Sequence, residues 1–433
     1  MLQSVRDTLG KLLPPEKCEE VLRLADRGLA PPGRPKSNSH IHLPPNFSAF
    51  RSVAQAVELA AGQDVRVVGL SNYYDFTVYG EFTELARARG IFPLFGLEII
   101  ALIDELVKSG VKVNDPGNPG KIYICGKGIC RFGRMTRRAR TLMDTIRRSD
   151  RQRMKAMTAK MAAIFEGGGL KTGLDDQRVI DLVARRSACP PQAITLQERH
   201  VALAFQEALF RMVPPQERAA RLGEIFGAQS ADRRDACPTD AVKVQNEIRA
   251  HLMKTGKPAF VAETFLGFDE AYRLVLELGG IPCYPTLADG ANPICAYEDP
   301  VDGLIERIKA RGIYCAELIP IRNQPDVLVR YVKAMRQAGL VITAGTEHNT
   351  LDMLPIEPAC AGGRCVPEEI KDIFWEGARV VAAHQFLAAH GRCGYVDAQG
   401  NLNGAYGDPE KRIEAFRRIG AAVIQSYFEM CAK

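Results

Sequence analysis

Hydrophobic and polar residues alternate along the chain with two periods, one typical of strands and one typical of helices. Short runs rich in β-branched residues, such as VRVVGL at 65–70, are followed by amphipathic segments that end in Gly, such as EFTELARARG at 81–90. Further strand-like runs lie at 92–100 and 258–264, and the alternation continues from 281 to 348. This order indicates βα units around a parallel sheet. About seven such units favour an α/β barrel over an open sheet.

The alternation is interrupted between residues 131 and 255, where the pattern is helical. Apolar residues there follow a three-four spacing, which predicts helices with one packing face. We therefore expect three parts, which are a helical extension at 1–36, a barrel built from 37–130 and 256–433, and a helical insertion at 131–255. An insertion at the catalytic rim of a barrel can also form a lid over the substrate pocket.

Composition is that of a globular protein, with 46% hydrophobic and 25% charged residues among 433. No apolar run reaches the roughly 18 residues of a membrane span, so we expect no membrane insertion. The first twenty residues are charged and lack the apolar stretch of a signal peptide. The twelve cysteines are scattered and form no CxxC motif, which favours reduced thiols and a cytoplasmic protein.

The net charge of +6 is concentrated in one segment. Residues 131–160 hold eleven Lys and Arg against two Asp, a local charge of +9, so the rest of the chain carries −3. The segment lacks interleaved aromatics and a nucleic-acid motif, which disfavours nucleic acid as a partner. A charged helix surface or a subunit contact is the favoured interpretation, which leaves a homo-oligomer open. Glu198 and His200, further along the insertion, form no HExxH motif, and we interpret them as a solvated helix surface rather than a lid contact.

Three polar clusters stand where predicted strands end: His40 with His42, Glu98, and Glu347 with His348. In a parallel barrel, the carboxyl ends of the strands face the active site. A His-x-His pair on a strand places both imidazoles on one face. Imidazoles and carboxylates that converge from different strands suit zinc, manganese or iron. We predict that these residues hold one divalent metal ion, with His348 as a substitute ligand.

Four motifs carry a resemblance to a known family. The chain has an HxH strand, the strand end GLSNYYD, the strand GLEI and the sequence GTEHN, in this order. In these motifs it resembles the polymerase and histidinol phosphatase (PHP) superfamily of metal-dependent phosphoesterases over residues 37–125 and 256–350. The resemblance implies a distorted (β/α)7 barrel and a metal site in which Glu98 takes the place of the bridging carboxylate and Glu347 that of an aspartate.

The chain departs from the family at most of the remaining ligand positions. The departures are Asn72, Tyr73, Tyr284 and Asn349, which stand where the family has metal ligands. The resemblance therefore implies one metal site in place of a cluster of two or three. A single ion can act as a Lewis acid or lower the pKa of a bound water, but it cannot form a two-metal clamp.

Other polar residues near strand ends suit a small anionic substrate. Arg and Lys can bind a carboxylate or phosphate, and Tyr or Lys can transfer protons. The candidate catalytic residues are Tyr73, Tyr284 and Lys127. The candidate substrate-binding residues are Asn72, Lys121, Asp289, Arg322, Asn323 and Asn349. For each tyrosine, the alternative is that the ring only fills space left by a missing metal.

These observations favour a metal-dependent hydrolase that acts on a small anionic substrate, either phosphorylated or sugar-derived. A lyase, aldolase or isomerase that acts on a sugar acid is the alternative enzyme class, because one metal and nearby tyrosines suit enolate chemistry. A non-catalytic, metal-stabilised binding module is the third hypothesis.

Overall fold

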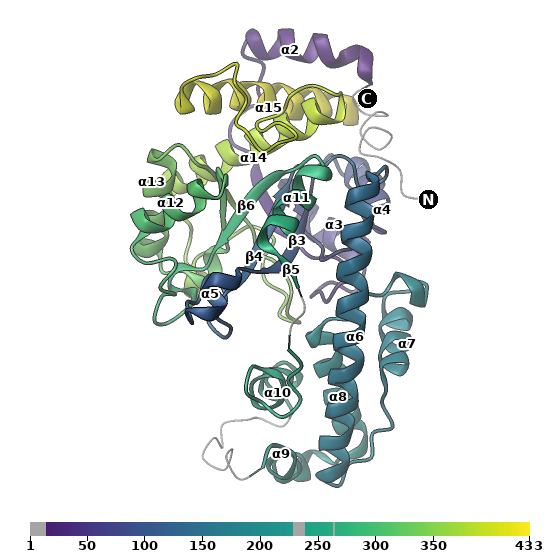
Figure 1. Ribbon diagram of the computed structural model, residues 1–433. Helices are drawn as coiled ribbons and strands as arrows, with labels where there is room; N and C mark the ends of the chain where they lie inside the picture. The colour runs from purple at the N-terminus through teal and green to yellow at the C-terminus, as the bar shows by residue number, and fades with distance from the viewer. Residues whose placement is uncertain (1–13, 228–238, 263–264) are drawn as a thin grey trace.

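The core of the molecule is a barrel-like sheet that is nearly closed. The computed structural model describes residues 14–227, 239–262 and 265–433 (Figure 1). The sheet contains, in spatial order, β1 (Lys36–Ile41), β2 (Val65–Leu70), β3 (Phe92–Leu102), β4 (Lys121–Lys127), β6 (Ile281–Thr286), β7 (Cys315–Leu318) and β8 (Val341–Ala344). Past the end of β8, the backbone N–H of His42 donates to the carbonyl of Glu347 at 2.8 Å, which brings the chain after β8 back to the end of β1. The expected α/β barrel-like sheet is confirmed.

The direction of β4 differs from the expectation of parallel βα units. β4 is antiparallel to both β3 and β6, and Lys121 pairs with Leu102 at the end of β3. Residues 103–120 contain only the short helix α5 (Asp104–Lys108) and turn the chain back, with the N–H of Ile103 donating to Gly120. This segment forms a return loop instead of a crossover helix, so an antiparallel strand follows it.

The prediction of a strand at 258–264 is wrong for residues 258–262, which contain no strand, and residues 263–264 lie outside the described part of the chain. The nearest strand is β5 (Leu266–Gly267), which pairs with the end of β3.

Helices cover the outside of the barrel. They are α3 (Val53–Gly62), α4 (Tyr79–Ala88), α11 (Phe268–Glu277), α12 (Val301–Ala310), α13 (Pro325–Gln337) and α14 (Glu368–Ala389). At the end of the molecule seen at the top of Figure 1, α15 (Pro409–Cys431) packs on α14, and α2 (Cys18–Asp26) packs on α15. On its other side, α14 packs closely on β8. Glycine is required at position 377 of α14, since a Cβ there would lie 1.9 Å from the carbonyl oxygen of Ile342 in β8.

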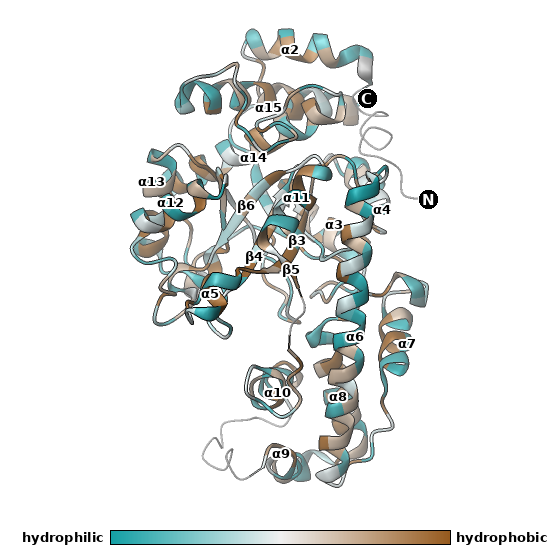
Figure 2. Ribbon diagram, in the orientation of Figure 1, coloured by the Kyte–Doolittle hydropathy of each residue, from teal (hydrophilic) through white to brown (hydrophobic). Residues whose placement is uncertain are grey.

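The segment between the two halves of the barrel is helical. It contains α6 (Arg137–Gly167), α7 (Asp176–Arg186), α8 (Glu198–Met212), α9 (Arg218–Phe226), α10 (Ala241–Ile248) and a π-helical turn, η5 (Arg249–Met253). Helix α6 starts beside the barrel and extends beyond it with the other helices at its side (Figure 1). Figure 2 shows much of α6 as hydrophilic, in contrast to the hydrophobic strands β3, β4 and β5.

Two separate hydrophobic cores meet along α6. Met143 and Ile146 belong to the core of the barrel, whereas Met154, Met157 and Phe165 belong to a core formed by the inserted helices. Because one continuous helix takes part in both cores, it fixes the insertion to the barrel. None of the helices in the described part of the chain is long and apolar enough to cross a membrane.

Candidate metal centre and the cavity above it

Three buried ligand atoms converge inside the barrel. His40 Nε2 and His42 Nε2 lie 3.2 Å apart, and Glu98 Oε2 lies 3.2 Å from the second and 3.7 Å from the first. The period of β1 places both imidazoles on one side, and Glu98 reaches them from β3. Ligands about 2.0–2.1 Å from a tetrahedral ion lie roughly 3.3–3.4 Å from one another, close to the distances seen here. Glu98 Oε2 has no hydrogen-bond partner among the described residues, as expected for an atom that ligates a metal. These three residues therefore fit a divalent metal.

A buried carboxylate orients the first histidine. Glu317 Oε1 lies 2.7 Å from His40 Nδ1, which turns Nε2 towards Glu98. A metal-ligating histidine commonly donates its other ring N–H to a carboxylate in this way. The Lys127 ammonium lies 2.5 Å from Glu317 Oε2 and also donates to the carbonyl of Ser39 at 3.1 Å. Burial alone would raise the pKa of Glu317, but Lys127, followed by His40, lowers this pKa to about 2.

Lys127 was a candidate catalytic residue, and the structure places it beneath the metal group instead of in the cavity. Its side chain is 3% exposed, and the ammonium forms an ion pair with Glu317. Burial alone would lower the pKa of Lys127, but the charge and hydrogen bond of Glu317, together with the nearby thiols of Cys125 and Cys283, raise the pKa above its usual value. Lys127 therefore stays charged, and its contacts indicate a positioning role.

A second group of possible metal ligands, formed by His40, Cys125 and Glu317, is also buried. Cys125 and Glu317 have ligand atoms within 4.8 Å of those of His40. Burial raises the pKa of the Cys125 thiol well above its usual value, and Glu317 is engaged by Lys127. Since metals bind the thiolate, this group fits a metal less well than the group formed with His42 and Glu98.

Glu347 lies at the rim of this site, paired with an arginine. Arg322 contacts both carboxylate oxygens of Glu347, with Nη1 2.8 Å from Oε1. Asn349 Nδ2 donates to Oε2 at 2.5 Å. Burial opposes ionisation of Glu347, but Arg322 and the two histidines of β1 hold its pKa below the usual value. Glu347 thus faces Arg322 in this structure, outside the three-residue metal group.

His348, the expected substitute ligand, points away from the metal group. Its Nδ1 lies 2.7 Å from Thr346 Oγ1, and its Nε2 lies 2.9 Å from the carbonyl oxygen of Leu354. The ring also stacks on Phe50 at 4.6 Å. Both ring nitrogens are therefore engaged elsewhere. The backbone explains this, because Glu347 and His348 both adopt left-handed conformations, with φ of 58° and 54°.

Tyr73 lines the cavity next to the metal group. Its ring stacks on that of His42, with centroids 5.0 Å apart and planes 9° apart. Burial and the neighbouring Glu98 carboxylate raise the pKa of Tyr73 well above its usual value. The hydroxyl therefore stays protonated at neutral pH and can donate a hydrogen bond.

Tyr284, in contrast, is buried in the wall of the barrel and does not line the cavity. Its hydroxyl donates to Glu298 Oε1 at 2.8 Å. The Glu298 carboxylate also accepts from the backbone N–H groups of Leu287 and Ala288. Burial raises the pKa of Glu298 to about 7 despite these hydrogen bonds. Tyr284 and Glu298 hold the loop after β6, which makes Tyr284 a positioning residue.

Three of the candidate substrate-binding residues are also engaged with the protein. Asn72 bridges the backbone N–H and carbonyl of Leu43 at 2.8 and 3.0 Å. Asn323 Nδ2 donates to Asp289 Oδ1 at 2.9 Å, and Asp289 also accepts from the N–H of Gln324. None of the three lines the cavity. Their amides and carboxylate stabilise loops at the end of the barrel.

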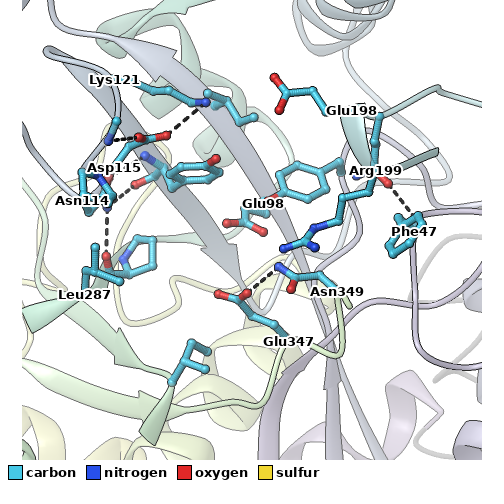
Figure 3. Close-up of a pocket in the computed structure, with 18 of the residues that line it drawn as sticks. Phe47, Glu98, Asn114, Asp115, Lys121, Glu198, Arg199, Leu287, Glu347 and Asn349 are labelled. Carbon is cyan, nitrogen blue, oxygen red and sulfur yellow. Dashed lines mark hydrogen bonds and ion pairs between the residues drawn. The ribbon is translucent and has the colours of Figure 1, made fainter. Parts of the chain in front are cut away.

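A cavity of about 540 Å³ opens above the metal group, between the barrel and the insertion. This volume is within the range of about 300–1,000 Å³ typical of small-molecule sites. The barrel contributes Tyr73, Glu98, Lys121, Arg322, Glu347 and Asn349 to its lining. Figure 3 labels Glu98, Lys121, Glu347 and Asn349 among them. The insertion contributes Asp150, Arg153, Gln197, Glu198, Arg199, Arg249 and Lys254.

The sequence left a lid formed by the insertion open, but it did not indicate which residues of the insertion line the cavity. His200, expected on a solvated surface, is 3% exposed, and its Nδ1 accepts from the N–H of Gln197 at 3.1 Å. Arg199 beside it enters the cavity. No motif or spacing distinguishes Arg199 from the exposed arginines of the same segment, so only the tertiary structure reveals it.

Comparisons with known proteins support the fold. No family model and no curated protein sequence matches the chain. A structure from Bifidobacterium adolescentis, described as a candidate metal-dependent phosphoesterase, is similar with a TM-score of 0.51 and 14% identity, over 78% of this chain and 95% of that chain. An amidohydrolase from Chromobacterium violaceum, with bound sulfate and no metal, has a TM-score of 0.48 and 16% identity, over 78% of this chain and 96% of that chain. At 14% identity, the similarity to the Bifidobacterium structure shows a shared fold and no more.

Proposed function

We propose that the chain is a PHP-like hydrolase that uses one divalent metal ion to cleave a small anionic substrate, with a phosphate ester as the favoured class. The observation that carries this proposal is the convergence of His40 Nε2, His42 Nε2 and Glu98 Oε2 at the floor of a cavity whose lining includes six Lys and Arg side chains as well as carboxylates. Catalytic zinc sites typically have three protein ligands and one position open to water or substrate. The description of the similar structure as a metal-dependent phosphoesterase supports this class.

The residues of the chain have separate roles in this proposal. His40, His42 and Glu98 would hold the ion, which when bound lowers the pKa of a water molecule and polarises the substrate. Glu317 fixes the ring orientation of His40. Arg322 binds the anionic group of the substrate in the same bidentate manner in which it now binds Glu347.

Two further groups face the reacting atoms. When Arg322 turns to the substrate, Glu347 loses its strongest partner and can accept a proton from the attacking water. Tyr73 stays protonated and donates a hydrogen bond to a substrate oxygen. The proposal also includes a cytoplasmic location, which the eleven described cysteines support because all of them are free thiols.

The test combines metal analysis with a substrate screen. We expect about one ion per chain in protein purified without chelators, and metal-dependent turnover of a phosphate ester in a panel that also includes sugar acids. His42→Ala removes one ligand and should abolish stoichiometric binding. The matched control is His390→Ala, which changes a histidine at the end of α14 and should leave metal content unchanged.

Three results would contradict the proposal. Two or three ions per chain would refute the single site. The absence of any bound ion, with no binding after metal is added, would refute the metal centre. Turnover of sugar acids alone would favour a lyase or isomerase.

A further inference from the structure

The first turn of α8 is fixed against the loop that follows the metal-binding strand β1. The side chain of Gln197 accepts from the backbone N–H of Phe47 at 2.6 Å. The ring of Phe47 packs on His200, with centroids 5.4 Å apart, and lies 6.0 Å from the guanidinium of Arg199. Phe47 is five residues after His42, so the same loop connects the metal group to the insertion. Arg199 therefore has a defined position relative to the metal group.

Arg199 differs from other cations of the cavity in lacking a partner. Arg322 pairs with Glu347, and Lys121 pairs with Asp115 at 3.1 Å. Glu198 pairs with Arg153 at 2.5 Å and lies 3.8 Å from both Arg249 and Lys254. Within residues 14–227, 239–262 and 265–433, the guanidinium of Arg199 has no hydrogen bond or ion pair, and its contact is the ring of Phe47. Figure 3 shows it pointing into the cavity towards Glu347 and Asn349.

The surroundings make this charge costly in the absence of a ligand. Burial and the neighbouring guanidinium of Arg249 lower the pKa of Arg199 to about 10. Arg322 adds to this effect, while Glu347 and Tyr73 oppose it. A largely enclosed cation without a hydrogen-bonded anion is unfavourable, and an anionic ligand removes the penalty. Glu347 and Tyr73 lie beside the metal group, so Arg199 is within electrostatic reach of the metal site.

We propose that Arg199 of the helical insertion binds the anionic group of the substrate over the metal centre, opposite Arg322, and so supplies positive charge that a second metal ion would otherwise provide. This inference rests on the proposed function. Arginine clamps can stabilise charge on a transferring phosphoryl group as metal ions do. Guanidinium groups also match a phosphate in a planar, bidentate geometry. The insertion is then part of the active site, and the ligand class is an oxyanion with two negative charges, such as a phosphate monoester.

Binding of inorganic phosphate tests this role directly. Isothermal titration calorimetry is performed on the full chain, with and without added metal, for the wild type, Arg199→Gln and Arg199→Lys. We expect Arg199→Gln to weaken phosphate binding tenfold or more in both metal states, with unchanged metal content. Arg199→Lys should retain part of the affinity, because lysine keeps the charge but loses the bidentate geometry.

The matched control is Arg185→Gln, which removes an exposed arginine from α7 in the same insertion. It should leave phosphate affinity unchanged. The melting temperature of Arg199→Gln without phosphate should equal or exceed that of the wild type, since the variant removes an unpaired enclosed charge. A merely structural role of Arg199 predicts a lower melting temperature instead.

Two outcomes would overturn the inference. One is wild-type phosphate affinity in Arg199→Gln, and the other is the absence of phosphate binding by the wild type. Failure of the proposed function would look different. In that case the wild type would show no metal binding or no turnover, while the metal-free protein would still bind phosphate through Arg199.

Discussion

Replacement of Glu317 by Gln tests the buried chain that supports the metal group. Glu317 is fully buried between the Lys127 ammonium and the His40 ring, at 2.5 and 2.7 Å. Gln has nearly the same shape and can still accept from the N–H of His40, but it carries no charge. The substitution therefore leaves Lys127 as a buried ammonium with neutral partners only.

The expected loss of stability follows from the pKa of Glu317. A carboxyl with a pKa of about 2 in the folded protein and 4.5 when unfolded stabilises the fold above pH 4.5 and loses this contribution as the pH falls towards 2. At about 1.4 kcal/mol per pKa unit, the difference corresponds to roughly 3 kcal/mol at neutral pH. Removal of one partner from a buried ion pair typically costs about 3–5 kcal/mol, which agrees.

A double variant separates stability from metal positioning. Lys127→Met combined with Glu317→Gln removes the lone ammonium and should recover most of the stability in urea unfolding of metal-free protein. Metal affinity, measured by competition with a chelator, should stay about 10–100-fold reduced in both variants, because a neutral acceptor orients His40 less strongly. A loss below about 1 kcal/mol in Glu317→Gln, or a double variant as unstable as the single one, would refute the reasoning.

Two further predictions concern the tyrosines and the buried glutamate behind the cavity. Tyr73→Phe keeps the stacked ring on His42 and should lower kcat/KM roughly 10–100-fold by removing a hydrogen bond to a charged group. Tyr284→Phe should leave kcat/KM near that of the wild type. Equal effects of both substitutions in steady-state kinetics would contradict these assignments. Glu298 has a pKa raised to about 7 from 4.5, so its contribution to stability is present below pH 4.5 and is lost as the pH rises through about 7, a change of roughly 3 kcal/mol. Glu298→Gln should flatten this part of the pH profile of urea unfolding, and an unchanged profile would show that other groups cause it.

The elements of the barrel could be predicted because the two periods of the sequence correspond to local structure. The strand period also places His40 and His42 on one face of β1, and the structure brings them together with Glu98. The direction of β4 could not be predicted, because KIYICGK reads as a strand in either orientation. The direction depends on how residues 103–120 turn back, which local patterns do not specify.

The contacts of individual side chains were harder to predict than the strands. Glu347 and His348 are neighbours at a strand end, and two successive left-handed residues decide that the first faces the cavity and the second does not. Tyr284 and Lys127 lie near strand ends as expected, but each reaches a buried carboxylate first. Arg199 lies more than 150 residues from His42 in the sequence, and the docking of α8 on Phe47 brings it to the cavity.

The charges of the site provide an independent argument for joining the barrel and the insertion in one function. In the proposed enzyme, a divalent ion and Glu98 together carry a charge of +1, with His40 and His42 neutral. The two ion pairs of the barrel, Glu317 with Lys127 and Glu347 with Arg322, add no net charge. With the barrel groups alone, a phosphate monoester with two negative charges would therefore leave an excess of −1. The insertion contributes four cations to the lining, Arg153, Arg199, Arg249 and Lys254, against Asp150 and Glu198, which is a net charge of +2. The barrel alone therefore suits a singly charged group, and the barrel with its insertion suits a doubly charged one.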